Sequence, residues 1–260
     1  MTPREELADL LQRARAEAGY GSQGALAKRL NVSRPVISKA ESAGQPPPSE
    51  AILAAWAGAT GAPLDRLNEL AERARSGVPD WFVPWLGPEA GATLLRYWSP
   101  FIVPGIAQTK AYMHALFEDE GHLLGQAEEM VAARLQRQQV MERVPVTIII
   151  GYHVLYRVVG SPAVMSAQMG HLAALAERSM VAVHVLPETV TTGSYGELGI
   201  ATGGDGTTVS MPTLQDITST EPKMVSKALV AWERLLGAAM PRRDSLTLIR
   251  SAERSWKEQA

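Results

Sequence analysis

The sequence predicts two domains, a mainly α N-terminal domain and an α+β C-terminal domain with a small mixed or antiparallel sheet. The first part of the chain repeats apolar residues at helical spacing, with Leu7, Leu10 and Leu11 as its opening set. The later part alternates helical stretches with short runs of β-branched residues. Between them lies the small and flexible sequence around Ser76-Gly77-Val78-Pro79. We therefore expect domains at residues 1–76 and 77–260.

A pair of short helices is predicted between Ser22 and Glu41. Ala27 is a small residue in the middle of the first helix, where a second helix can approach closely. Asn31 suits the turn, because its short side chain tolerates left-handed backbone geometry. Ser33 is a good N-cap for the second helix, which we expect to run from Arg34 to about Ala43. This spacing is typical of a helix-turn-helix that reads DNA, and a purely structural helical hairpin is the alternative.

The second helix of this pair carries one polar face. Arg34, Pro35, Ser38 and Lys39 fall on that face at helical spacing, while Ile37 falls on the opposite side. An exposed helix face of this kind fits the major groove of DNA.

Residues 4–75 resemble the Cro-type helix-turn-helix of phage repressors and xenobiotic-response-element regulators. The resemblance rests on Ser22-Gln23, Leu26-Ala27, Val32-Ser33, Ile37-Ser38 and Glu41. It implies a five-helix domain, whose fourth helix follows Pro46-Pro47-Pro48-Ser49 and whose fifth follows Pro63. It also implies DNA contacts by Gln23, Ser33, Arg34, Pro35, Ser38 and Lys39.

Pro35 departs from the family pattern, which usually has a polar residue there. Proline offers a base edge only a van der Waals surface. Sequence reading is therefore expected to depend mainly on Arg34 and Lys39, with Gln23 and Ser38 positioning the helix on phosphate.

Charge and composition limit the remaining possibilities. The chain has 260 residues and a net charge of −2. It contains no cysteine, so disulfides and thiolate metal sites are excluded. Residues 10–45 nevertheless carry a balance of +4, which suits phosphate contacts on one face but not strong non-specific binding by a monomer. The N-terminus is unlike a signal peptide and no apolar run reaches membrane length. We expect a cytoplasmic protein that does not enter a membrane.

The C-terminal part is expected to contain several strands and helices. Strands are predicted at 146–159, possibly as two, and at 181–186, and a hairpin is predicted around Gly203-Gly204-Asp205-Gly206. Helices are predicted at 108–117, 127–141, from 162 onward, 223–239 and 243–257.

Six aromatic residues gather within about twenty residues at the start of this part. They form either a hydrophobic seam or part of a pocket for a ligand or partner. The six are Trp81, Phe82, Trp85, Tyr97, Trp98 and Phe101.

Nearly all of residues 80–260 resemble the uncharacterised C-terminal domain of actinobacterial helix-turn-helix regulators. The resemblance rests on Tyr97 to Thr109 with Tyr112, on Ala133 to Gln138, and on Met165 and Gln168. It implies an antitoxin-like regulator paired with a small, separately encoded acidic protein. The chemistry of that family is unknown, so no catalytic residue is implied.

The sequence contains little that indicates an enzymatic function. The five histidines show no metal-ligand spacing, and there is no nucleophile elbow or phosphate-binding loop motif. We expect no catalytic residue, no metal and no cofactor.

We therefore expect a homodimeric transcriptional regulator that binds a pseudo-palindromic double-stranded operator. The C-terminal domain is expected to bind a small acidic protein through Trp98, Phe101, Tyr112, Arg134 and Arg137. Alternatively, these aromatic residues belong to the core and the arginines pair with Glu128, Glu129 or Glu142. The second functional hypothesis is a ligand-sensing repressor with a small-molecule pocket in the same domain.

Overall fold

A computed structural model describes residues 3–75, 82–119, 124–190, 196–212 and 217–260. The chain divides into two compact units, which are described separately. Unit 1 comprises residues 1–80 and 123–133, and unit 2 comprises residues 81–122 and 134–260. The expected domain boundary between residues 76 and 77, and Trp81 of the aromatic group, lie outside the described residues.

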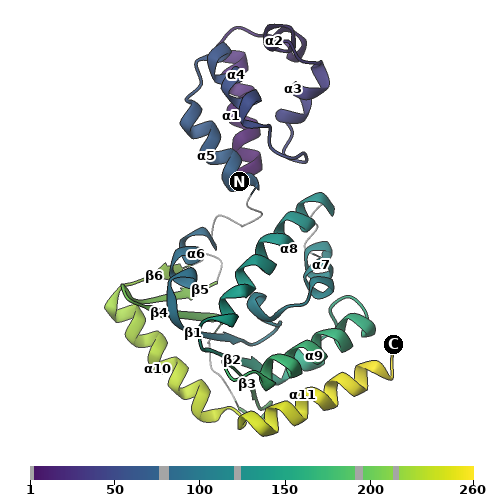
Figure 1. The fold of residues 1–260 in the computed structure, drawn as a ribbon, viewed down its shortest axis with the longest axis vertical. Helices are drawn as coiled ribbons and strands as arrows, with labels where there is room; N and C mark the ends of the chain where they lie inside the picture. Colours follow the sequence, from purple (N-terminus) through teal and green to yellow (C-terminus); the bar gives the residue numbers. More distant parts are fainter. Residues whose placement is uncertain (1–2, 76–81, 120–123, 191–195, 213–216) are drawn as a thin grey trace. The chain divides into compact units, whose positions relative to one another are not determined.

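Unit 1 contains five successive helices (Figure 1), and residues 123–133 from later in the chain also belong to it. The five are α1 (Pro3–Glu17), α2 (Gln23–Leu30), α3 (Arg34–Ala40), α4 (Glu50–Thr60) and α5 (Leu64–Arg75). The five-helix prediction is thereby confirmed.

The core of unit 1 is formed by the apolar stripes of these helices. Leu7 and Leu11 of α1, Leu53 and Trp56 of α4, and Leu67 of α5 belong to one buried cluster. Leu26 and Ile37 join the same cluster from α2 and α3. Burial of each large aliphatic side chain contributes about 1.5–3 kcal/mol, so this cluster fixes the two short helices against the longer ones.

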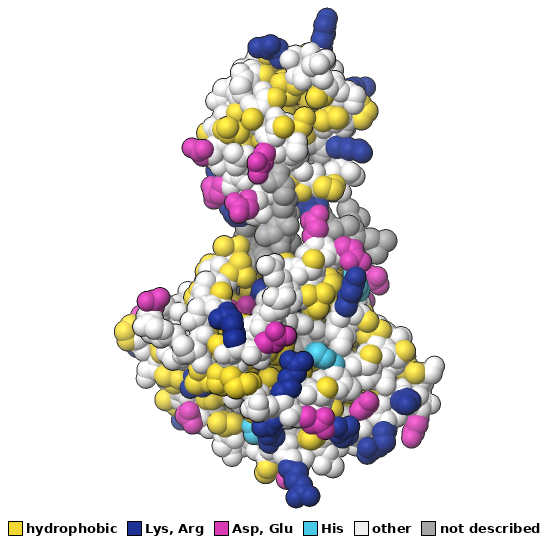
Figure 2. All heavy atoms as spheres, viewed as in Figure 1, with side chains coloured by type: hydrophobic (Ala, Val, Ile, Leu, Met, Phe, Trp, Pro, Cys, Tyr) yellow, Lys and Arg dark blue, Asp and Glu magenta, His cyan; other side chains and the backbone are white. Residues whose placement is uncertain are grey.

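The surface of unit 1 is uneven in charge. Figure 2 shows Lys and Arg side chains gathered toward the end where α2 and α3 lie, and Asp and Glu side chains toward the other end. Glu5 and Glu6 lie in the first turn of α1, and Asp65 lies in the first turn of α5. The exposed cations on α2 and α3 are Lys28, Arg29, Arg34 and Lys39.

Unit 2 is built on a mixed sheet of the six described strands, in the order β3-β2-β1-β4-β5-β6. The pairs β1–β2 and β2–β3 are parallel, whereas β1–β4, β4–β5 and β5–β6 are antiparallel. This arrangement confirms the predicted α+β class with a mixed sheet. The strands are β1 (Ala92–Ser99), β2 (Val146–Gly151), β3 (Val181–Leu186), β4 (Leu198–Gly203), β5 (Gly206–Met211) and β6 (Ile217–Ser219).

Helices flank this sheet and connect its strands (Figure 1). The α-helices are α6 (Val83–Ala90), α7 (Lys110–Asp119), α8 (Leu124–Gln138), α9 (Pro162–Glu177), α10 (Pro222–Ala238) and α11 (Arg242–Lys257). The 3₁₀ helices are η2 (Gly105–Ala107), η3 (Gln139–Glu142) and η4 (Tyr152–Leu155). In α8, the residues up to Ala133 belong to unit 1 and those from Arg134 belong to unit 2.

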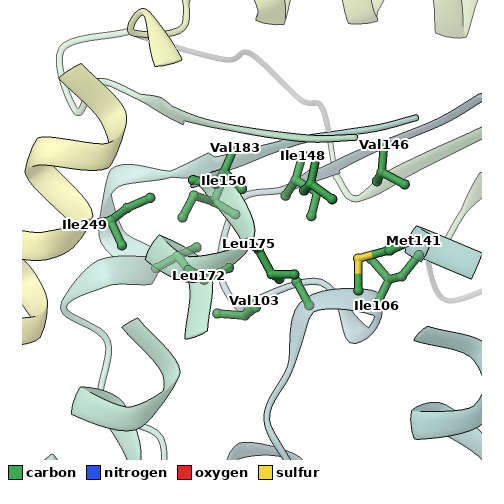
Figure 3. Close-up of a cluster of buried hydrophobic side chains, with 14 of the residues drawn as sticks. Val103, Ile106, Met141, Val146, Ile148, Ile150, Leu172, Leu175, Val183 and Ile249 are labelled. Atoms are coloured by element: carbon green, nitrogen blue, oxygen red, sulfur yellow. The ribbon is translucent and has the colours of Figure 1, made fainter. Parts of the chain in front are cut away.

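Both faces of the sheet are buried. On one face, Ile148 and Ile150 of β2 and Val183 of β3 point toward Leu172 and Leu175 of α9 (Figure 3). On the other face, side chains of five strands pack against α10, whose Trp232 is 2% exposed. The strand residues in this second cluster are Trp98, Ile149, Leu186, Leu198, Ile200 and Val209.

The structure corrects the predicted elements in three places. β1 contains Tyr97 and Trp98, which the sequence predicts as part of a hydrophobic seam or of a pocket, without a strand. β2 ends at Gly151 rather than continuing to residue 159, because the chain turns into the 3₁₀ helix η4 at Tyr152. α3 ends at Ala40 and not near Ala43, because the chain leaves helical geometry after its C-cap residue, Glu41.

None of the helices in the described part of the chain is both long and apolar enough to cross a membrane.

Candidate nucleic-acid interface

The geometry of α2 and α3 follows from local sequence. The Ser22 hydroxyl oxygen accepts a hydrogen bond from the Ala25 amide at 3.2 Å and so caps α2. Asn31 ends α2 in the left-handed conformation, with a φ of 53°, as the sequence predicts. The Val32 amide then donates to the Ala27 carbonyl at 3.0 Å, which closes the turn.

α3 presents a polar face on the side opposite its buried residues. Ile37 and Ala40 are buried, at 0% and 6% exposure. Arg34, Pro35, Ser38 and Lys39 are all exposed, and so is Ser33 in the N-cap position. The structure therefore brings five of the six predicted DNA-contact residues together on the surface of one short helix.

The sixth residue, Gln23, lies at the start of α2 and is half-buried. Its Nε2 donates a hydrogen bond to Glu41 Oε2 at 3.0 Å. A primary amide has two N–H groups, so one donor remains for an outside acceptor such as a phosphate oxygen. Gln23 and Arg34 also line the same polar pocket, of about 520 Å³, together with Ser22 and Gly24.

A buried ion pair supports this end of unit 1, and the sequence analysis did not predict it. Arg15 Nε donates to Glu41 Oε1 at 2.5 Å and its Nη2 donates to Glu41 Oε2 at 3.1 Å, while Nη1 donates to the Tyr20 carbonyl at 2.9 Å. The two side chains are only 10% and 4% exposed. The hydrogen bond and the charge of Glu41 raise the pKa of Arg15, against the opposing effect of burial. The pair joins the end of α1 to the end of α3.

The predicted partner-binding residues of unit 2 lie in different environments. Trp98 and Tyr112 are core residues, at 2% and 1% exposure, and the Tyr112 hydroxyl oxygen accepts from the Val103 amide at 3.3 Å. Phe101, by contrast, is 60% exposed. Arg134 Nη1 donates to Gln108 Oε1 at 2.6 Å, and its guanidinium carbon lies 4.8 Å from the centre of the Phe117 ring. The five residues thus do not share one surface.

Arg137 belongs to a buried polar network around Glu89, which is 2% exposed. Arg137 Nε and Nη2 donate to the two Glu89 oxygens at 2.7 and 3.0 Å. Trp85 Nε1 and the Tyr97 hydroxyl also donate to Glu89, at 3.2 and 2.5 Å. Burial and the adjacent carboxylate raise the pKa of Tyr97 well above its ordinary value. The arginine pairs with Glu89 instead of with the nearby acids considered from the sequence.

The motif between Val103 and Thr109 forms a loop held by side chains from other elements. Gln168 donates to the Ala107 carbonyl at 2.8 Å and accepts from the Thr109 amide at 2.7 Å. Gln138 donates to the carbonyls of Gly105 and Gln108 at 3.0 and 2.8 Å. Buried backbone groups need such partners when they lie outside regular structure. The residues that carried the second resemblance therefore hold this loop in one conformation.

No group of three or more His, Cys, Asp or Glu side chains in the described ranges is placed to hold a metal ion. One half-buried acid, Glu197, accepts a hydrogen bond from the Ser99 hydroxyl at 2.8 Å at the end of β1. Burial raises the pKa of Glu197, while the hydrogen bond from Ser99 and the charge of Arg134 oppose that shift.

Comparison with known protein families gives two matches along the chain. Residues 6–70 match the model of a helix-turn-helix domain. Residues 85–251 match the model of a domain of unknown function, DUF5753. Neither a curated protein nor a solved structure matches the chain significantly. The chain therefore belongs to the DUF5753 family and carries a DNA-binding helix-turn-helix domain at its N-terminal end.

Proposed function

We propose that the protein is a cytoplasmic transcriptional regulator that binds a specific operator through α2 and α3. The observation that carries this proposal is the exposed face of α3, where Arg34 and Lys39 stand opposite the buried Ile37. Arginine and lysine make the commonest specific contacts with guanine in the major groove. Gln23, at the start of α2, would contact the neighbouring phosphate through its remaining amide donor.

The active species on DNA is a symmetric dimer on a pseudo-palindrome. A recognition helix as short as α3 covers few base pairs, and the +4 balance of residues 10–45 is modest. Two copies with half-sites about 34 Å apart would double both contributions. A footprint that covers one half-site at saturation, by a monomer, contradicts this part of the proposal.

Loss of Arg34 and Lys39 is expected to weaken operator binding and relax its sequence preference. A bidentate contact with a base contributes about 1–3 kcal/mol of discrimination. Arg34→Ala should therefore lower affinity for the preferred site by about 5- to 150-fold, and the Arg34→Ala/Lys39→Ala variant by more. The measurement is fluorescence anisotropy at fixed salt, after selection of the preferred site from a random DNA library.

Arg243→Ala is the matched control, since Arg243 is an exposed arginine on α11 of unit 2. It removes one positive charge without touching α3 and should leave the selected sequence unchanged. If the double variant selects the same sequence with the same affinity as the native chain, base reading by this face is excluded.

A second proposed function is that unit 2 receives a signal from a small acidic protein, and Phe101 favours it. This side chain is exposed on the short segment between β1 and the loop held by Gln138 and Gln168. An apolar side chain on an ordered loop loses little conformational entropy on binding, which suits an interface anchor.

Phe101→Ser is expected to release a partner that the native chain retains. Loss of a central anchor costs about 2 kcal/mol or more, which is at least about a 30-fold loss of affinity. The test compares the full-length chain, purified from its native host, with Phe101→Ser and with Met180→Ser, in which another exposed apolar residue is removed. A stoichiometric small protein that only Phe101→Ser loses supports the proposal. A retained metabolite, with no protein, supports the ligand-sensing repressor instead.

A further inference from the structure

The outer face of α11 carries a stripe of four cations. On its inner side, Ile249 and Trp256 are buried in the core, at 0% and 6% exposure. At about 100° per residue, the four cations fall within a sector of about 60°, and no other residue of α11 falls inside that sector. The members of this stripe, all exposed, are Arg243, Arg250, Arg254 and Lys257.

The acidic residues of α11 do not neutralise the stripe. The helix holds five cations against two acids, a balance of +3. The two acids, Asp244 and Glu253, lie outside the sector, one beyond each of its edges. Among the described residues, Arg250 pairs with Glu177, whereas none of the other three cations of the stripe takes part in an ion pair. Figure 2 shows Lys and Arg side chains, and some acidic ones, over the region of unit 2 where Figure 1 places α11.

Both ends of α11 are fixed to the rest of unit 2. Near its start, the Ser245 hydroxyl accepts from the Val185 amide at 2.9 Å and donates to the Met240 carbonyl at 3.1 Å. Near its end, Trp256 Nε1 donates to the Leu155 carbonyl at 2.7 Å. The stripe is therefore presented on a rigid helix, over a length of about 21 Å. One strand of B-DNA presents about six phosphates over such a length.

The chemistry of this face decides between possible occupants. Protein interfaces have apolar anchors at their centre, and helices that lie on membranes insert an apolar face. None of the large apolar side chains that are exposed in the described part of the chain belongs to α11, because the apolar side of this helix is in the core. Protein–DNA interfaces are instead polar and positively charged. Arginine, which supplies three of the four cations, binds phosphate in a bidentate manner.

DNA is also the polyanion that this chain already meets. Its N-terminal part is a DNA-binding helix-turn-helix domain, and the covalent connection raises the effective concentration of DNA at unit 2. The balance of +4 over residues 10–45 is modest. A second set of phosphate contacts would add affinity to the complex without adding sequence information.

We infer that the outer face of α11 binds the phosphate backbone of duplex DNA. The contacts come from Arg243, Arg254 and Lys257, with Arg250 as the fourth cation of the stripe. They are independent of base sequence, because the phosphates are the same at every position. The inference goes beyond the proposed function, which assigns the DNA contacts to α2 and α3.

The test is the salt dependence of DNA binding by Arg243→Gln/Arg254→Gln/Lys257→Gln, the α11 variant. Each phosphate contact contributes about 0.9 to the slope of log K against log salt, so loss of three lowers the slope by about 2.7 for each chain bound. Between about 50 and 200 mM salt, the native chain should therefore lose about 40-fold more affinity than the α11 variant. The measurement is fluorescence anisotropy of the full-length chain on a duplex of random sequence and on the selected operator.

Arg157→Gln/Lys223→Gln/Lys227→Gln is the matched control, because it removes the same charge from exposed residues of unit 2 outside α11. It should keep the native slope. Arg34→Ala/Lys39→Ala separates the two sets of DNA contacts. That variant should lose the sequence preference and keep the part of the slope that depends on α11, whereas the α11 variant should keep the preference. Native thermal unfolding of each variant confirms that it is folded.

Two results would overturn the inference. The first is a slope for the α11 variant that equals the slope for the control. The second is an unchanged slope together with loss, by the α11 variant alone, of a small acidic protein that the native chain retains on purification from its host. That result would assign the face to a protein partner. The random duplex keeps the test valid even when no preferred sequence is selected, so failure of the proposed function is distinguishable from failure of this inference.

Discussion

Arg137→Leu is expected to lower the free energy of unfolding of unit 2 by about 3–5 kcal/mol. The Arg137 and Glu89 side chains are only 17% and 3% exposed, and they share two hydrogen bonds. Removal of the arginine leaves a buried carboxylate whose remaining donors are Trp85 and Tyr97, neither of which is positively charged. The penalty therefore comes mainly from the isolated charge and less from the lost contact.

The same argument predicts partial rescue by a second substitution. In Arg137→Leu/Glu89→Gln the buried group is neutral, so we expect this double variant to be more stable than Arg137→Leu alone. Urea unfolding of the full chain, followed by hydrogen exchange of β1 amides, measures the stability of unit 2.

Arg250→Leu is the matched control for this experiment. Arg250 also pairs with a glutamate in unit 2, but its side chain and that of Glu177 are 44% and 52% exposed. Exposed pairs contribute about 0–1 kcal/mol. A loss of less than about 1 kcal/mol in Arg137→Leu, or no rescue by Glu89→Gln, would show that the network does not stabilise the unit.

The helix-turn-helix could be predicted from sequence because its signals are local. Ser22, Asn31 and the buried Ile37 each act within a few residues of their own position. The residues of the exposed face follow from helical spacing alone. The end of α3 at Ala40 could not be derived in this way, because three more residues would also fit a helical pattern.

β1 could not be predicted because both of its faces are buried. Leu95 contributes to the core on one side of the sheet and Trp98 to the core on the other side. The apolar and polar alternation that identifies a half-exposed strand is therefore absent. Its parallel pairing with β2 joins residues about fifty positions apart, which no local pattern encodes.

The polar contacts of unit 2 were missed for a similar reason. Sequence analysis considered acids close to Arg137 along the chain, but its partner Glu89 is 48 residues away. Gln138 and Gln168 were recognised as characteristic of the family, although their role in holding the loop at 103–109 depends on contacts between distant elements. Such contacts become visible only when the fold brings the elements together.

Arg15→Met is expected to destabilise unit 1 by about 3–5 kcal/mol and thereby to abolish operator binding on mild heating. The substitution leaves the Glu41 carboxylate, 4% exposed, with the Gln23 amide as its remaining side-chain donor among the described residues. The same carboxylate accepts from Gln23 and joins the end of α3 to α1, so α3 loses support as well. A domain as small as unit 1 has a total stability of about 5–10 kcal/mol, so a loss of this size removes about half of it.

The matched control for this variant is two residues away on the same helix. Arg13 pairs with Asp9, but the side chains are 60% and 47% exposed, so Arg13→Met should cost less than about 1 kcal/mol. Operator affinity measured between 10 and about 40 °C should fall steeply for Arg15→Met and remain near native for Arg13→Met. Equal temperature dependence in the two variants would mean that the Arg15–Glu41 pair does not hold α3 in place, and that burial of Ile37 alone fixes the recognition helix.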